Sequence, residues 1–186
     1  MSSTPKIQLV CERVRKKVMS SLEEASVAHV GIIDDPEMAT IASYQEYGWV
    51  QRVTARQAGW FRRQLGSGPK VGTALVLQPR PFFRGTIAAE SKNWAGTYRQ
   101  ALKVYGPDNA YKALLVTAIK ASEDIKATMI NGGTSDGKFH DRKPLTQALY
   151  SAQAGGRETD GTGNIEGPKP LIKSGALLNS IGYQLG

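Results

Sequence analysis

The sequence predicts an α+β fold in which a mixed or antiparallel sheet of about four strands carries helices on one face. Three observations favour this class. Short runs rich in β-branched residues, such as 27–33, predict strands. Two long helical patterns, 83–105 and 108–130, meet at a Gly-Pro-Asp turn. The strands are too few, and the helices too unequal in length, to indicate a doubly wound parallel sheet.

The N-terminal elements are predicted by spacing and by capping residues. Apolar residues three and four positions apart predict an amphipathic surface helix: Ile7, Val10, Val14, Val18 and Leu22. The strand at 27–33 stops at Asp34-Asp35-Pro36, where Asp35 can cap a helix that begins with Pro36 and ends near Tyr47. Gly48 then closes that helix, because glycine tolerates the left-handed conformation.

The central elements are bounded by glycines and prolines. Residues 49–53 predict a weaker strand, and Thr54 can cap a short helix that reaches Leu65. The run 66–69 is a break, and residues 71–77 predict the third strand.

The C-terminal third has a weaker pattern. Residues 134–168 predict extended loops or an arm, mobile over the glycine-rich stretch 154–168 and interrupted by a helical piece from Pro144 to Ala152. Ser174 can cap a short helix with Leu177 and Leu178, and residues 181–185 predict a final strand. At 186 residues the whole chain, 1–186, is expected to form a single domain.

Composition narrows the classes of function. Lys and Arg number 24 against 16 Asp and Glu, so the net charge of +8 indicates either a nucleic-acid or an acidic protein partner. No apolar run approaches the roughly 18 residues of a membrane span, and no signal peptide is evident, which predicts a cytoplasmic protein with no membrane partner. The single cysteine, Cys11, allows neither an internal disulfide nor a cysteine metal cluster.

The residues give little support to an enzymatic function. Residues 66–73 and 161–167 lack the order of a phosphate loop and the spacing of a dinucleotide fingerprint, and no Gly-x-Ser-x-Gly elbow occurs. Of the two histidines, His29 is expected to be a partly buried strand residue. His140 and Asp141, beside basic residues, leave open a metal-dependent, basic nucleic-acid-processing enzyme. Asp34-Asp35 is better explained by helix capping than by magnesium. We expect no enzyme, cofactor or metal.

The run 78–84, Gln-Pro-Arg-Pro-Phe-Phe-Arg, is the most informative feature of the chain. Its two prolines fix where a strand stops and a helix starts, so the run predicts a rigid corner that presents contact groups. We expect partner contacts at four residues of this run: Arg80, Phe82, Phe83 and Arg84. Trp49 and Arg157 are further expected contact residues. Core packing of Phe82 or Phe83 is the alternative.

Four stretches together resemble the tail-completion and head-tail joining proteins of tailed bacteriophages, also called virion morphogenesis or minor tail proteins. They are Val-Gly-Ile-Ile at 30–33 with Tyr-Gln-Glu-Tyr-Gly at 44–48, Arg-Pro-Phe-Phe-Arg at 80–84, the long helical middle, and Pro-Leu-Ile-Lys-Ser-Gly-Ala-Leu-Leu-Asn-Ser-Ile at 170–181. Lys173 stands where the family usually has aspartate, and Trp49 where a small residue usually follows the glycine. These departures affect a local contact rather than the implied fold.

The resemblance implies a structural virion protein that forms a ring, expected to be a hexamer, at the neck between tail and head connector. The implied neighbours are a tail terminator or tail tube protein on one side and a head connector protein on the other. A tail terminator or a head-side connector ring is the alternative within this class. The implied location is the virion, after assembly in the host cytoplasm. DNA passing through the ring would meet positive charge without sequence reading, and Arg62 and Arg63 are the expected lining residues.

Overall fold

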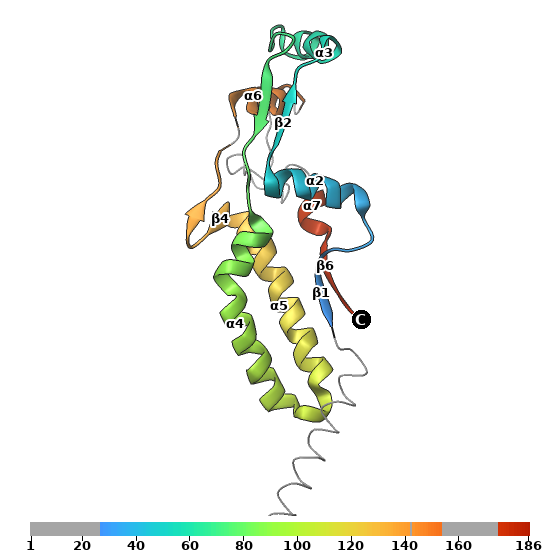
Figure 1. Ribbon diagram of the computed structural model, residues 1–186, viewed down its shortest axis with the longest axis vertical. Coiled ribbons are helices and arrows are strands. Elements are labelled where there is room, and N and C mark those ends of the chain that lie inside the picture. Colours follow the sequence, from blue (N-terminus) through green and yellow to red (C-terminus); the bar gives the residue numbers. More distant parts are fainter. Residues whose placement is uncertain (1–26, 142, 154–174) are drawn as a thin grey trace, which may run out of the picture. The chain divides into compact units, whose positions relative to one another are not determined.

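The computed structural model describes residues 27–141, 143–153 and 175–186 (Figure 1). This part of the chain divides into two compact units. The first contains residues 27–33, 90–124 and 181–186, and the second contains the other described residues. Two long helices, α4 (Phe82–Tyr105) and α5 (Ala110–Asn131), each contribute to both units.

The first unit contains an antiparallel pair formed by strands from the two ends of the described chain. β1 (Ala28–Ile32) pairs with β6 (Ile181–Leu185), with Ala28 opposite Leu185 and Ile32 opposite Ile181. Ile181 is buried, with 2% of its surface exposed. His29 is exposed rather than partly buried, so that expectation is wrong.

The helical part of the first unit is held by a polar contact between α4 and α5. A short 3-10 helix, η1 (Pro107–Asn109), joins the two helices. Trp94 Nε1 donates a 2.8 Å hydrogen bond to Asp124, and Lys120 Nζ donates one of 2.7 Å to the same carboxylate. The hydrogen bond to Asp124 raises the pKa of Lys120 above its ordinary value.

The second unit begins with α2 (Pro36–Tyr47), whose start is as predicted. Asp35 caps the helix, since its side chain accepts a 2.9 Å hydrogen bond from the amide of Met38, and Pro36 is the first helical residue. The short helix α7 (Ala176–Asn179) contacts α2, as the ribbon also shows (Figure 1).

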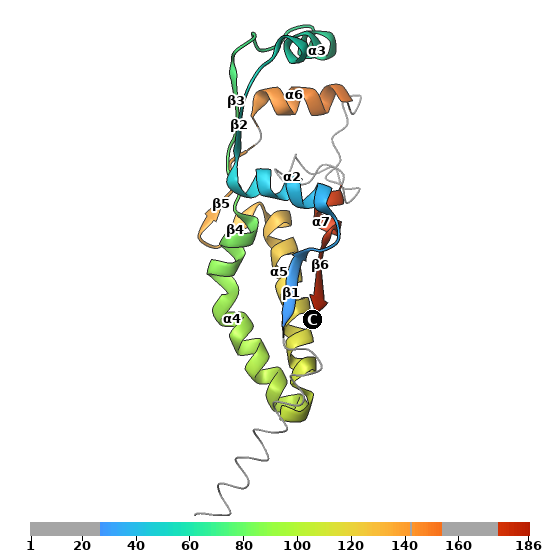
Figure 2. The ribbon, with the colours of Figure 1, turned by 45° about the vertical axis from the view of Figure 1, so that its right-hand side comes forward.

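Residues 49–77 form an arm, which consists of a two-stranded ribbon with a helix at its tip (Figure 2). β2 (Trp49–Arg52) pairs antiparallel with β3 (Ala74–Leu77), and α3 (Ala55–Leu65) lies between them in sequence. Thr54 and Gln57 form a capping box at the start of α3. Gly66, left-handed at φ 72°, ends the helix.

The rest of the second unit comprises a small hairpin, a helix and the buried start of α4. β4 (Gly133–Thr134) pairs with β5 (Gly137–Lys138), and α6 (Pro144–Gln153) contacts α3. Phe82 and Met129 are fully buried. Thr86 and Thr128, also buried, share a hydrogen bond of 2.7 Å between their hydroxyl groups. This bond satisfies two polar groups that burial would otherwise leave unpaired.

The strands and helices largely lie where the sequence predicts them, but the sheet does not. The described strands form three separate antiparallel pairs rather than one sheet of about four strands. The reason is that, among the described strands, β2 pairs only with β3 along the arm, and β1 pairs with β6. The hairpin β4–β5 and η1 are additions, and the third strand begins at Ala74 rather than Val71. The helix predicted at 7–22, Cys11, Ser174 and the glycine-rich stretch 154–168 with Arg157 lie outside the described residues.

Candidate interaction site

The start of α4 is capped by a carboxylate from a different helix. Glu46, in the last turn of α2, accepts hydrogen bonds of 3.0 Å from the backbone amides of both Phe83 and Arg84. The amide of Phe82 donates to the carbonyl of Arg80. The first turn of a helix has free amides and a partial positive charge, so a carboxylate is well placed there.

Glu46 is also paired with the side chain of Arg84. Arg84 Nε lies 2.9 Å from a Glu46 carboxylate oxygen, and its Nη2 donates to the backbone carbonyl of Glu46 at 3.0 Å. The Glu46 side chain is 5% exposed, whereas that of Arg84 is 55% exposed. A buried carboxylate needs a positive partner and several hydrogen bonds, and this one has both.

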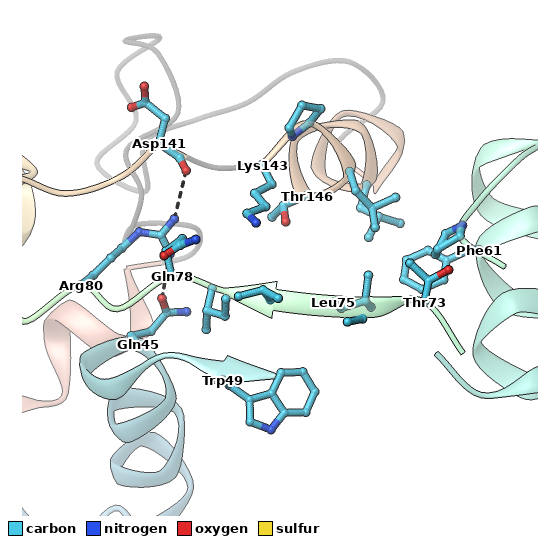
Figure 3. A pocket seen from close by; sticks show the side chains of 17 residues that line it. Gln45, Trp49, Phe61, Thr73, Leu75, Gln78, Arg80, Asp141, Lys143 and Thr146 are labelled. Carbon is cyan, nitrogen blue, oxygen red and sulfur yellow. Dashed lines mark hydrogen bonds between the residues drawn. The ribbon is translucent and has the colours of Figure 1, made fainter. Parts of the chain in front are cut away.

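Arg80 secures the other side of the corner. Its Nη1 donates to the side-chain oxygen of Gln45 at 3.0 Å, and its Nε donates to the carbonyl of His140 at 3.2 Å. Its Nη2 lies 3.5 Å from the carbonyl of Asp141. Figure 3 shows this guanidinium between Gln45 and the chain at Asp141. We call Glu46, Arg80, Phe82 and Arg84 the corner junction.

Backbone conformation and close packing explain why the motif at 44–48 ends in a glycine, Gly48. Its φ of 76° disfavours other residues. A Cβ atom placed here would lie 2.7 Å from the carbonyl oxygen of Leu77 and 3.0 Å from the Pro79 ring. The chain leaving α2 therefore passes directly against the end of β3, which only glycine permits.

Two of the four corner residues support the fold rather than present contact groups. Arg80 is 4% exposed and Phe82 0% exposed, so neither offers its side chain to a partner surface. This corrects the expectation for these two residues, because their hydrogen-bonding and packing capacity is used within the second unit. Phe83 is half-buried and lies against Phe82 with ring centroids 4.6 Å apart. Arg84 remains accessible.

Three aromatic side chains and Arg84 form an exposed aromatic cluster around the corner junction. Tyr47 is 64% exposed, and the guanidinium of Arg84 lies 4.5 Å from the centre of its ring. Tyr44 is 46% exposed and contacts Trp49, with ring centroids 5.8 Å apart. Tyr44 and Tyr47 are neighbours on α2 because they are three residues apart.

The sequence analysis selected Trp49 and Arg84 but missed the two tyrosines. Both belong to the motif at 44–48, and their spacing of three on a helix that carries no clear apolar stripe was the available signal. Exposed Tyr, Trp and Arg side chains are the residue types most often found at the centre of protein interfaces. The aromatic cluster is therefore the strongest candidate for a protein contact surface.

An apolar pocket of about 520 Å³ lies beside the ribbon, within the second unit (Figure 3). Its apolar walls come from the ribbon, α3 and α6: Trp49, Leu75, Leu77, Phe61, Leu145 and Leu149. Arg80, Asp141 and Lys143 add polar groups to the lining. The pocket therefore shares Trp49 with the exposed aromatic cluster and Arg80 with the corner junction.

Arg62 and Arg63, predicted to line a DNA channel, are both exposed on α3 at the tip of the arm. Arg62 Nε donates to the carbonyl of Ala58 at 3.4 Å.

The alternative enzymatic site gains no support from the described geometry. His140 and Asp141 contribute backbone carbonyls to Arg80, and their side chains are exposed. In the described ranges, no three His, Cys, Asp or Glu side chains come together to hold a metal ion. Asp35 acts as a helix cap. None of the helices in the described part of the chain is both long and apolar enough to cross a membrane.

Comparisons of the chain with protein-family models, with curated proteins and with solved structures found no match. The resemblance to the bacteriophage proteins therefore depends on the sequence motifs alone.

Proposed function

We propose that this protein is a structural, noncatalytic component of a tailed bacteriophage virion, which forms a tail-completion ring at the neck. The ring, expected to be a hexamer, would join the tail terminator or tail tube to the head connector. A tail terminator or a head-side connector ring is the alternative position. Imaging of assembled particles distinguishes these positions, because each predicts a different level along the neck.

The single observation that carries the proposal is the direct bonding between two of the motifs on which the resemblance depends. Glu46, from the motif at 44–48, caps and pairs with Phe83 and Arg84 of the motif at 80–84. The two motifs lie more than thirty residues apart. The proposal rests on this contact because it joins the two motifs into one structural unit.

The ends of the other motifs also meet. Within the first unit, β1 with Val30 and Gly31 pairs with β6, which begins at Ile181, the last residue of the C-terminal motif. Within the second unit, α7 of that C-terminal motif contacts α2. The elements that carry the resemblance are therefore partners of one another in each unit.

The aromatic cluster supplies a surface on which copies could associate. A double Tyr47→Ala, Trp49→Ala variant should shift the purified protein from a ring to smaller species at concentrations where the parent is assembled. Native mass spectrometry measures the shift. Tyr105→Ala is the matched control, because Tyr105 is 42% exposed at the end of α4 and outside the cluster. A parent protein that stays monomeric under all conditions would contradict the ring.

The role in the virion is tested by deletion and imaging. Without the protein, we expect filled heads and separate tails, and restoring the chain should restore joined particles. Electron microscopy of particles that carry a labelled copy should place the label at the neck. Normal particles without the protein, or metal-dependent nuclease activity lost in His140→Ala, would refute the proposal.

A further inference from the structure

We propose that the outward face of α3 binds the phosphate backbone of double-stranded DNA without reading its sequence. The face consists of Arg56, Gly59, Trp60 and Arg63. This inference deepens the proposed function, from which it takes only the source of the DNA. The chemistry of binding depends on the arm alone.

The arm carries positive charge without any acidic residue. Residues 49–77 contain four arginines and one lysine and no aspartate or glutamate: Arg52, Arg56, Arg62, Arg63 and Lys70. All five side chains are exposed. Within the described part of the chain, the ion pairs join other residues, Arg84 to Glu46 and Lys120 to Asp124. The arm thus presents five cations that no described carboxylate neutralises.

The helix divides these charges between two faces. Arg56, Trp60 and Arg63 are spaced by four and three residues, so they share one stripe of α3. The opposite stripe contains Ala58 and Phe61, which are 2% and 7% exposed. Arg56 and Arg63 lie about 10 Å apart along the helix axis, far enough for each guanidinium to reach a different phosphate.

This geometry revises the pair predicted from the sequence. Arg62 belongs to the side of the helix next to the buried stripe, and its Nε is bonded to the Ala58 carbonyl. Arg63 lies on the outward stripe with Arg56. The relevant pair is therefore Arg56 and Arg63, because adjacent residues on a helix do not share a face.

Gly59 lies on the outward stripe between Arg56 and Arg63, in the interior of α3. Glycine in a helix interior is less favourable than alanine, so it needs a reason. The described neighbours provide none, because a Cβ atom at Gly59 would meet nothing within 4 Å. A glycine at such a place allows close approach of another molecule to the helix backbone. The charged face is therefore open at its centre.

These features favour a nucleic acid over an acidic protein surface. Protein–DNA interfaces are much more positively charged than protein–protein interfaces, and the DNA backbone offers closely and evenly spaced negative charges. Trp60, 38% exposed between the two arginines, adds an apolar surface suited to a sugar edge. A row of backbone phosphates complements a helix face that has no acidic residue, whereas most protein surfaces carry charges of both signs.

The test measures binding of the purified full-length protein to a fluorescent mixed-sequence duplex at several salt concentrations. Each phosphate contact contributes about 0.9 to the slope of log affinity against log salt. The double variant Arg56→Ala, Arg63→Ala should reduce that slope by about 2. The control is Lys92→Ala, Arg99→Ala, which removes two exposed cations seven residues apart on α4 and should leave the slope unchanged.

Gly59→Ala separates a binding role from a folding role. Alanine is the better helix former and meets no neighbour, so the melting temperature should stay the same or rise. Affinity for the duplex should nevertheless fall several-fold, because the added methyl group holds the backbone away from the phosphates.

Three results would overturn the inference. They are equal losses of slope in the two double variants, parental affinity in Gly59→Ala, and competition by poly-glutamate as effective as that by duplex, which would indicate an acidic protein partner. Failure of this inference is distinguishable from failure of the neck role. A ring that joins heads to tails but does not bind duplex refutes only the DNA contact, whereas a duplex-binding protein absent from particles refutes only the neck role.

Discussion

The corner junction and the arm are adjacent in sequence and opposite in character. In the corner junction, Glu46, Arg80 and Phe82 are nearly inaccessible, and the two charged groups are matched by hydrogen bonds. In the arm, cross-strand neighbours Val50 and Val76 are 64% and 39% exposed, and five cationic side chains are exposed. Isolated two-stranded ribbons are marginally stable in water. The residues that are most recognisable in the sequence are thus buried in the fold, while less conspicuous ones are exposed to solvent.

The largest expected effect distinguishes the two adjacent phenylalanines. Phe82→Ala should lower the free energy of unfolding by about 3–5 kcal/mol, because it leaves a cavity at a fully buried position. Phe83→Ala, at a half-buried position, should cost roughly 1–2 kcal/mol. Urea denaturation followed by circular dichroism measures both. A greater loss from Phe83→Ala would reverse the assignment of which ring belongs to the core.

The second effect concerns the carboxylate of the corner junction. Glu46→Gln should destabilise the protein by about 2–3 kcal/mol, because an amide cannot accept all the hydrogen bonds that converge on the charged group. Thermal unfolding is the measurement. Glu37→Gln, an exposed change in the first turn of the same helix, is the control and should cost little. Equal losses of stability in the two variants would show that the Glu46 cap on α4 contributes nothing beyond its negative charge.

A smaller effect is expected in the arm. Thr54→Ala removes the capping box of α3 and should cost about 1 kcal/mol. The loss should be local, so hydrogen exchange should accelerate at amides of α3 and stay unchanged at the start of α4. Thr40→Ala, which removes a hydroxyl bonded to a carbonyl within α2, is the control and should leave α3 unaffected. Uniform acceleration throughout the second unit would mean that arm and corner unfold as one.

The smallest effect is expected at the exposed face of the ribbon. Val50→Thr should change the free energy of unfolding of the isolated chain by no more than about 0.5 kcal/mol, because the side chain is already largely in water. Val53→Thr, at a position 2% exposed, places the same hydroxyl in the core and should cost about 1–3 kcal/mol. Chemical denaturation of both variants gives the comparison. A large cost at Val50 would show that this face is covered in solution.

Local signals in the sequence were sufficient to predict most elements. Asp35 with Pro36, Thr54 and Gly66 mark helix ends through caps and backbone conformation, which depend only on nearby residues. Strand partners could not be predicted in the same way. Whether β1 joins β2 or β6 is decided by contacts across more than a hundred residues, and the alternation of side chains carries no information about the partner.

The site was predictable only in part, for a similar reason. The prolines at 79 and 81 correctly mark where β3 stops and α4 starts, but the cap on α4 comes from Glu46, which nothing in the local sequence connects to this corner. Adjacent residues such as Phe82 and Phe83, or Arg62 and Arg63, look equivalent in sequence. A helix turns each of them to a different side, and only the packing around the helix decides which side is buried.

The close passage at Gly48 has a mechanical consequence. One strand of the ribbon leaves α2 through this glycine, and the other ends at Leu77, whose carbonyl oxygen and the nearby Pro79 ring lie beside it. The following amide, that of Arg80, donates a 2.7 Å hydrogen bond to the carbonyl of Gln45. Both strands are thus anchored at one base, next to the start of α4. We expect a force on the tip to reach α2 and the first turn of α4 through the paired strands, because both strands are anchored there.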